Sequence, residues 1–191
     1  MSINDKILYI QSSVDENFRL VVNEQWNSTT PDHRIKIRNC IEENFTSKFS
    51  RQQLAWLNDL NQLPKADDGF FSIAHCKTLG GFTYSKHPHG FDIEQTSRIS
   101  TDIIQRTASA KEQAAAPQLQ YLWVGKEAGF KALSSTRADL VITDLLCTEW
   151  QSHFENQVFS FRLNSLKTLD FGLNIGFIFS EADNLFCTYF K

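Results

Sequence analysis

The chain has 191 residues, of which 41% are apolar, 21% are charged and 16 are phenylalanine. This length can bury a substantial core, as one domain or as two fused halves, and no apolar run is long enough to cross a membrane. The formal net charge of −3 excludes a general attraction to nucleic acid or to membrane surfaces, so an anionic ligand would need a local cluster of basic side chains.

The cysteines and the first residues of the chain indicate in which compartment of the cell the protein is expected. The four cysteines are far apart and form no CxxC pair: Cys40, Cys76, Cys147 and Cys187. We expect them to be reduced and mostly buried, rather than a disulfide framework or a metal site. The first residues lack the basic and then apolar pattern of a signal peptide, and we therefore expect a cytoplasmic protein.

The first third of the chain is predicted to be mainly helical. Apolar residues at helical spacing predict a helix over residues 12–26: Val14, Phe18, Val21 and Val22. Thr-Thr-Pro-Asp at residues 29–32 breaks the chain and predicts a second helix that runs through Cys40. A third helix is predicted over residues 49–57.

A basic cluster lies in the second of these helices, at Arg34, Lys36 and Arg38. Two interpretations are open: the cluster meets the phosphates of a ligand, or it coats the helix with solvated charge.

Strands are predicted after residue 69. Residues 70–75 and 82–84 fit two strands that are joined through the glycines at positions 80 and 81. A turn over residues 86–90, with His87 and His89 beside a proline, then leads into a third strand at residues 89–95.

This third strand carries the first candidate site. In a strand, Phe91 and Ile93 point to one face, whereas Asp92 and Glu94 point to the other. Two carboxylates side by side repel each other, and a hard divalent cation such as Mg²⁺ would compensate them. The alternative is an edge strand with a solvated acidic face.

Three helices are predicted next. Ser97 or Ser100 caps a helix that carries three isoleucines on one side and Arg106 near its end. Ser109 and Glu112 have capping-box spacing and predict a short second helix. A third begins with Pro117 in its first turn and runs through Leu133.

The last part of the chain is predicted to be β structure. The strand candidates are residues 140–142, 158–163, 172–179 and 185–190, and the last two form an antiparallel hairpin through a turn at residues 180–184. Helices and antiparallel strands in mixed order indicate an α+β fold.

A second charged cluster lies on the helix after Pro117. Trp123, Glu127 and Lys131 recur every four residues and therefore share one stripe, with Lys126 beside it. As a surface ion pair, Glu127 and Lys131 would contribute only about 0.3–0.5 kcal/mol. The many apolar neighbours favour instead a partly buried functional cluster.

Four segments together resemble the 4′-phosphopantetheinyl transferase superfamily. Residues 90–94 match its G-x-D-x-E strand, and residues 123–131 match its W-x-x-K-E-[AS]-x-x-K helix. Residues 72–75, Ser-Ile-Ala-His, resemble its S-x-S-H strand, and residues 106–112 resemble its R-x-x-S-x-x-E linker. The resemblance covers residues 70–133 in consistent order.

The resemblance implies a fold and an activity. The fold would be α+β with antiparallel sheets in two pseudo-equivalent halves, residues 1–85 and 86–191, that face one cleft in a monomer. The protein would move the phosphopantetheine arm of coenzyme A to a serine of an acyl or peptidyl carrier protein. The transfer would depend on Mg²⁺ and release adenosine 3′,5′-bisphosphate. Neither nucleic acid nor a membrane is expected as a partner.

The resemblance also implies roles for individual residues. Asp92, Glu94 and Glu127 would hold Mg²⁺ against the pyrophosphate, and Lys131 and Lys126 would neutralise phosphate oxygens. The serine proton would pass to Glu127 or to a water held by the metal, and the sequence does not choose between them.

Three further residues are candidates for contact with the coenzyme. His75 would meet a phosphate, the 3′-phosphate by preference, and Arg34 and Arg38 of the basic cluster would meet the phosphates of the nucleotide. Two other functions remain open: a catalytically silent homologue that binds a carrier protein or a nucleotide, and another Mg²⁺-dependent enzyme that cleaves pyrophosphate bonds.

Overall fold

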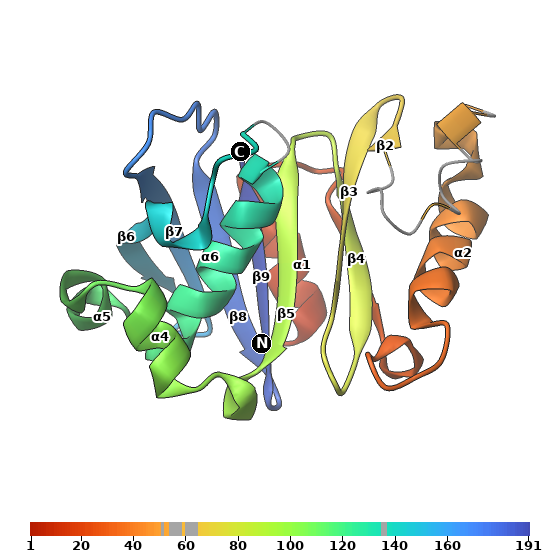
Figure 1. Ribbon diagram of the computed structural model, residues 1–191. Coiled ribbons are helices and arrows are strands. Elements are labelled where there is room, and N and C mark those ends of the chain that lie inside the picture. Colours follow the sequence, from red (N-terminus) through yellow and green to blue (C-terminus); the bar gives the residue numbers. More distant parts are fainter. Residues whose placement is uncertain (51, 54–58, 60–64, 135–136) are drawn as a thin grey trace.

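The computed structural model describes residues 1–50, 52–53, 59, 65–134 and 137–191, which form an α+β fold with two antiparallel sheets (Figure 1). In the first sheet the strand order is β1-β4-β3-β2: β1 (Arg19–Asn23), β2 (Lys65–Ala66), β3 (Gly69–His75) and β4 (Gly80–Ser85). In the second the order is β5-β9-β8-β7-β6: β5 (His89–Gln95), β6 (Leu145–His153), β7 (Val158–Ser165), β8 (Ile175–Glu181) and β9 (Asn184–Phe190).

Helices cover these sheets. The α-helices are α1 (Ile3–Ser13), α2 (His33–Phe45), α4 (Thr101–Thr107), α5 (Ala110–Ala115) and α6 (Leu119–Leu133). Short 3₁₀ turns occur at η1 (Glu24–Trp26), η2 (Thr46–Lys48), η3 (Thr96–Arg98) and η5 (Ile142–Asp144). Within the described residues, no helix is long and apolar enough to span a membrane.

The two sheets share one connectivity. In each, the first strand is followed by helical structure, and the last strand then returns to pair antiparallel with the first: β1 with β4, and β5 with β9. Beyond this pair, the remaining strands of each sheet lie in the reverse of their order in the chain: β3 then β2 in the first sheet, and β8 then β7 in the second. β6 adds an edge strand to the second sheet. The strands divide between the sheets at residues 86–88, although α1 packs on the second sheet. The division into two pseudo-equivalent halves, residues 1–85 and 86–191, stays a prediction.

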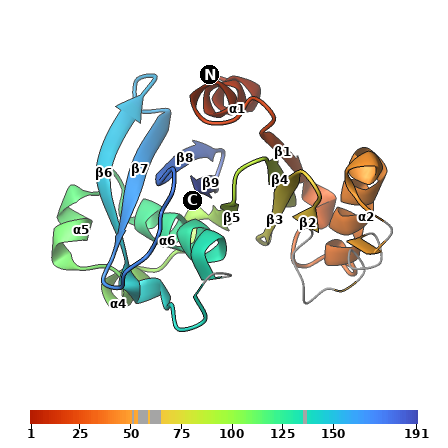
Figure 2. The ribbon, with the colours of Figure 1, turned by 90° about the horizontal axis from the view of Figure 1, so that it is seen from above.

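Apolar faces explain the layering. Figure 2 shows α1 and α6 on opposite sides of the second sheet and α2 beside the first. One core lies between α6 and the second sheet, and another lies between α1 and the opposite face of that sheet. Ile37 and Ile41 of α2 pack on Phe71, Phe82 and other aromatic residues of the first sheet.

Several predicted elements are confirmed. The strands at residues 70–75, 82–84 and 89–95 correspond to β3, β4 and β5, and the C-terminal hairpin is β8–β9. Ser100 caps α4, and Ser109 with Glu112 forms the predicted capping box of α5. All four cysteines carry free thiols, and all but Cys40 are buried.

The predicted helix over residues 12–26 is wrong. The helix ends at Ser13, and Val21 and Val22 lie in β1, where they pair with residues of β4. β-Branched side chains pack well on a pleated surface, and this pairing outweighs the helical spacing of the four apolar residues.

Smaller errors occur at turns. Gly80 and Gly81 lie inside β4 rather than joining two strands, and α6 begins after Pro117, with Gln118 as its N-cap. Residues 140–142 are not a strand, and β6 was missed because a bulge between Thr148 and Gln151 interrupts its alternation. Most of the predicted helix at residues 49–57 lies outside the described residues.

Replacing Gly90 with alanine tests the contact between β5 and α6. The new Cβ atom would lie 2.0 Å from the backbone oxygen of Ala128 and 2.6 Å from the backbone nitrogen of Ala132. Because backbone atoms cannot rotate away, the strand and the helix must separate, and we expect a loss of about 2–3 kcal/mol in the free energy of unfolding. Urea denaturation measures the loss. The control Gln151→Ala, at an exposed position of β6, should change stability by less than about 0.5 kcal/mol.

Candidate functional site

The candidate site lies where the edge strand β5 packs against the first sheet. The backbone N–H of Phe91 donates to the Ser72 hydroxyl of β3 at 2.9 Å, and the Thr83 hydroxyl of β4 bonds with Nε2 of His89 at 2.8 Å. Burial lowers the pKa of His89 to about 4, so its ring is neutral near pH 7. The histidine therefore joins the sheets as a neutral hydrogen-bonding group.

The two faces of β5 differ as its alternation predicts. Phe91 and Ile93 enter the core on the α1 side. Asp92 lies on the opposite face, since it is paired across the strands with Cys187, which belongs to the core beneath α6. Glu94 shares this face. The strand thus places two carboxylates under α6.

Helix α6 brings two further charges to this face. The Lys131 ammonium lies 2.7 Å from Oδ1 of Asp92 and also donates to the backbone oxygen of Phe91 at 3.0 Å. The helix approaches closely because Gly90 has no side chain to hold the backbone of Ala128 away. Glu127 lies four residues before Lys131, on the same stripe, and is half-buried.

The carboxylates repel one another. Burial, followed by the charge of Asp92, raises the pKa of Glu94, while Arg98, 3.9 Å away, and Lys131 oppose this rise. Burial and the charge of Asp92 also raise the pKa of Glu127, and Glu94 adds to the rise. Negative charge is therefore concentrated here beyond what Lys131 offsets.

Basic side chains from the first sheet and α2 lie on the other side of the site. Burial lowers the pKa of His75 at the end of β3, and the charges of His33, Arg34 and Lys131 lower it further. The rings of His33 and His75 meet edge to face with centroids 4.5 Å apart. Within the described part of the chain, the buried Nε2 of His33 has no hydrogen-bond partner. These groups together favour an anion.

The structure brings together most of the residues that the sequence singled out: Asp92, Glu94, Glu127, Lys131, His75 and Arg34. Lys126 lies elsewhere. Its side chain is fully buried, and its ammonium pairs with Glu112 at 2.9 Å, so it is not available to a phosphate. Arg38 is buried near Asp59, whose charge raises the pKa of Arg38 against a larger lowering by burial.

Sequence reasoning missed His33. It is the first residue of α2, where its Nδ1 lies 3.0 Å from the backbone oxygen of Thr30. The basic cluster directly after it was the one signal in the sequence. The histidine itself could not be singled out, because it packs against His75 of a distant strand.

The donor set suits a hard divalent cation. Among the described residues, no three His, Cys, Asp or Glu side chains are arranged closely enough to form a ready metal site. The three carboxylates nevertheless lie within electrostatic range of each other, and burial, followed by the charge of Asp92, raises the pKa of both Glu94 and Glu127. Mg²⁺ binds carboxylate oxygens and would relieve this repulsion, so the residues present fit the ion.

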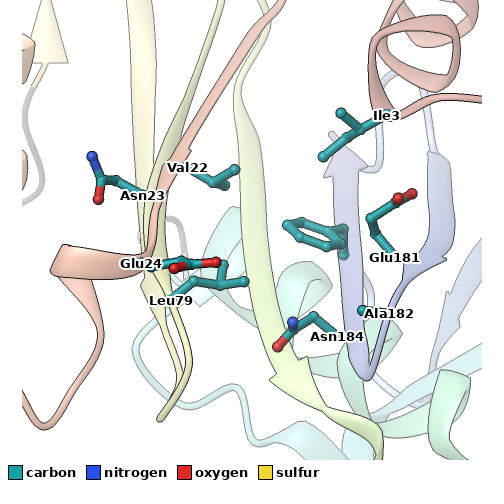
Figure 3. A pocket seen from close by; sticks show the side chains of 9 residues that line it. Ile3, Val22, Asn23, Glu24, Leu79, Glu181, Ala182 and Asn184 are labelled. Atoms are coloured by element: carbon teal, nitrogen blue, oxygen red, sulfur yellow. The ribbon is translucent and has the colours of Figure 1, made fainter.

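A groove of about 330 Å³ opens on the opposite face of the junction (Figure 3). Its walls come from α1, from β1 with η1, from the turn after β3, and from the β8–β9 hairpin. Phe186, which lines it, is paired with Ile93 and faces α1. The groove is therefore separated from the carboxylates by the β5–β9 layer.

Comparison with known proteins gives no family. No family model matches the chain, and a search of curated proteins finds no significant match.

Replacing Glu94 or Glu127 with glutamine tests whether the ionised carboxylates lower the stability of the fold. Because the folded-state pKa of each carboxyl is raised, folding carries a penalty that is absent below the ordinary Glu pKa, grows between that value and the raised one, and is fully present above the raised one. Each variant should be more stable than the parent by about 0.5–2 kcal/mol at pH 8, and by much less at pH 4.

Thermal unfolding in a chelator-containing buffer measures both differences. Glu16→Gln, at an exposed carboxylate, should match the parent at both pH values. A loss of stability at pH 8 in both site variants would show that the carboxylates are held by favourable contacts instead of being strained.

Proposed function

We propose that this protein transfers the 4′-phosphopantetheine arm of coenzyme A to a serine of an acyl or peptidyl carrier protein in a Mg²⁺-dependent reaction. The observation that carries the proposal is the composition of the junction site. Three carboxylates from β5 and α6 lie beside Lys131, and His75 with Arg34 acts on the same region from the first sheet. A metal-bound pyrophosphate with a further phosphate group matches this division of charge.

The reaction is a phosphoryl substitution. The serine oxygen attacks the phosphorus that carries the pantetheine arm, and the bond from that phosphorus to the bridging oxygen of the pyrophosphate breaks. Adenosine 3′,5′-bisphosphate leaves with the bonding electrons, and the serine hydroxyl loses its proton to a base. Negative charge develops on the bridging oxygen, where nearby positive groups lower the barrier most.

The acidic side of the site would hold the metal. Asp92, Glu94 and Glu127 are the residues that would bind Mg²⁺, which supplies positive charge to the pyrophosphate oxygens. Lys131 already lies against Asp92 and is only partly buried, so its ammonium can also reach a phosphate oxygen that approaches from solvent. Glu127 remains one of the two candidate acceptors of the serine proton, the other being a metal-held water.

The basic side of the site would hold the remaining phosphate. A phosphate placed beside His75 and Arg34 would accept charge-assisted hydrogen bonds from both. His33 extends this group, because its Nε2 lies within the same histidine pair and needs a partner. The 3′-phosphate of coenzyme A is the group we assign to this position.

Two features separate this function from the alternatives. A silent carrier-binding homologue has no requirement for three mutually repelling carboxylates, which cost stability unless they bind a cation. An enzyme that only hydrolyses pyrophosphate bonds needs no second basic group at a distance from the metal. The following experiment distinguishes all three.

The protein should load phosphopantetheine onto at least one of several apo carrier proteins when incubated with coenzyme A and Mg²⁺. Intact mass spectrometry of the carriers detects the added group, and replacing Mg²⁺ with a chelator should abolish the addition. Asp92→Ala and Glu127→Ala should each abolish transfer while the protein stays folded, because each removes a metal ligand. Glu16→Ala serves as a matched control that should transfer normally.

Three outcomes of this experiment would contradict the proposal or part of it. If no carrier gains mass while a known transferase loads the same carriers, transfer is not the function. Release of adenosine 3′,5′-bisphosphate without any loaded carrier would point to a hydrolase. Near-normal transfer by Asp92→Ala or Glu127→Ala would refute the metal assignment.

Calorimetric titration with coenzyme A tests the proposed phosphate contacts on both sides of the site. Lys131→Ala should weaken binding by about 1.5–3 kcal/mol through the loss of a charge-assisted contact. His75→Ala and His33→Ala should weaken binding of coenzyme A but leave binding of dephospho-coenzyme A, which lacks the 3′-phosphate, almost unchanged. Equal losses for the two ligands would place these histidines away from the 3′-phosphate.

A further inference from the structure

The buried Lys126 and its partner Glu112 are not used by the proposed reaction. The side chain of Lys126 is 0% exposed and that of Glu112 is 6% exposed, and their charged groups lie 2.9 Å apart. Burying two charges costs several kcal/mol per ion before their attraction is counted, and an apolar pair of similar volume often gives equal or greater stability. Net stabilisation therefore does not account for the presence of this pair.

Every acceptor position of the Glu112 carboxylate is occupied. Its Oε1 accepts from the backbone N–H of Cys147 at 3.1 Å, in addition to Lys126. Its Oε2 accepts from the backbone N–H of Ser109 at 2.9 Å and from the Ser109 hydroxyl at 3.0 Å. The Lys126 ammonium also donates to the backbone oxygen of Thr107. The pair thus has fixed geometry.

These contacts join the elements that surround α6. Thr107 ends α4, Glu112 belongs to α5, and Cys147 belongs to β6. Each is bonded either to Lys126 or to the carboxylate that holds it. Because hydrogen bonds are directional, α6 cannot turn about its axis or slide along it without breaking several of them at once.

The position of α6 is what the proposed site depends on. Lys126 directly precedes Glu127, and Lys131 follows a little more than one helical turn later. Successive residues are about 100° apart around a helix, so Lys126 faces α5 while Glu127 and Lys131 face β5. A rotation that freed Lys126 would carry both of these site residues away from Asp92.

We infer that Lys126 and Glu112 are positioning residues that fix the rotation and the height of α6, and so place Glu127 and Lys131 against β5. This inference rests on the proposed function, since it assigns the pair a role in transfer. It differs from a direct role for Lys126 at a phosphate, because a fully buried ammonium with two protein partners does not reach a ligand. It also explains the spacing of Ser109 and Glu112, which the reaction itself does not use.

The test compares Lys126→Met and Glu112→Gln with the double variant. Each single change leaves the other group without its partner and should lower the melting temperature, whereas the double variant removes both charges and should regain stability. The positioning role predicts that the double variant, although stable, loses kcat by about 10- to 100-fold, because small displacements of reacting groups cost this much. The KM for coenzyme A should change far less.

Ser109→Ala is a milder second variant. It removes the hydroxyl's contact with the carboxylate and its N-cap bond from the backbone N–H of Glu112, without leaving a charge unpaired, and should lower kcat severalfold at unchanged KM. A stable double variant with the parent's kcat would show that the pair is only structural. A raised KM for coenzyme A with unchanged stability in Lys126→Met would show a direct contact with the substrate. Either result overturns the inference.

A structural measurement separates this inference from the proposed function. In a crystal structure of the double variant, α6 should be displaced so that Lys131 and Asp92 no longer lie 2.7 Å apart. This readout applies even if the parent protein transfers nothing, in which case the proposed function fails on its own. An unmoved α6 in the double variant would overturn the positioning role whatever the activity.

Discussion

The edge of β5 is the constraint on which the rest of the structure depends. β5 ends the second sheet, so its outer backbone groups need partners other than a strand. The N–H of Phe91 donates to Ser72 of the first sheet, and the oxygen of Phe91 accepts from Lys131 of α6. One residue of the edge thus joins a sheet and a helix that the chain connects only through long segments, and the site forms where they meet.

This arrangement explains why a costly set of charges can persist. Lys131 satisfies the edge of β5 and offsets Asp92 with the same ammonium, so its removal would affect both. The remaining repulsion falls on Glu94 and Glu127, whose pKa values are raised. Functional sites commonly keep such strain where the surrounding fold is stable enough to hold it.

Local patterns in the sequence predicted the parts of the site that depend on local geometry. Alternation placed Asp92 and Glu94 on one face of β5, and helical spacing placed Glu127 with Lys131. Contacts between distant segments were not predictable: His33 matters through His75, and Lys126 has its partner on another helix. The same limit explains the error at residues 12–26, where pairing of Val21 and Val22 with β4 decides the structure.

The two lysines of α6 show how surroundings assign different roles to the same side chain. Lys126 is fully buried, and it meets a carboxylate that already accepts from three protein donors. Lys131 meets a group of carboxylates with charge left over, and more than a quarter of its side chain is exposed. A pair whose hydrogen-bonding positions are all taken by protein groups holds the fold in place. An unsaturated pair open to solvent can exchange its partners for a ligand, and for this reason the proposed function assigns the phosphate contact to Lys131 rather than to Lys126.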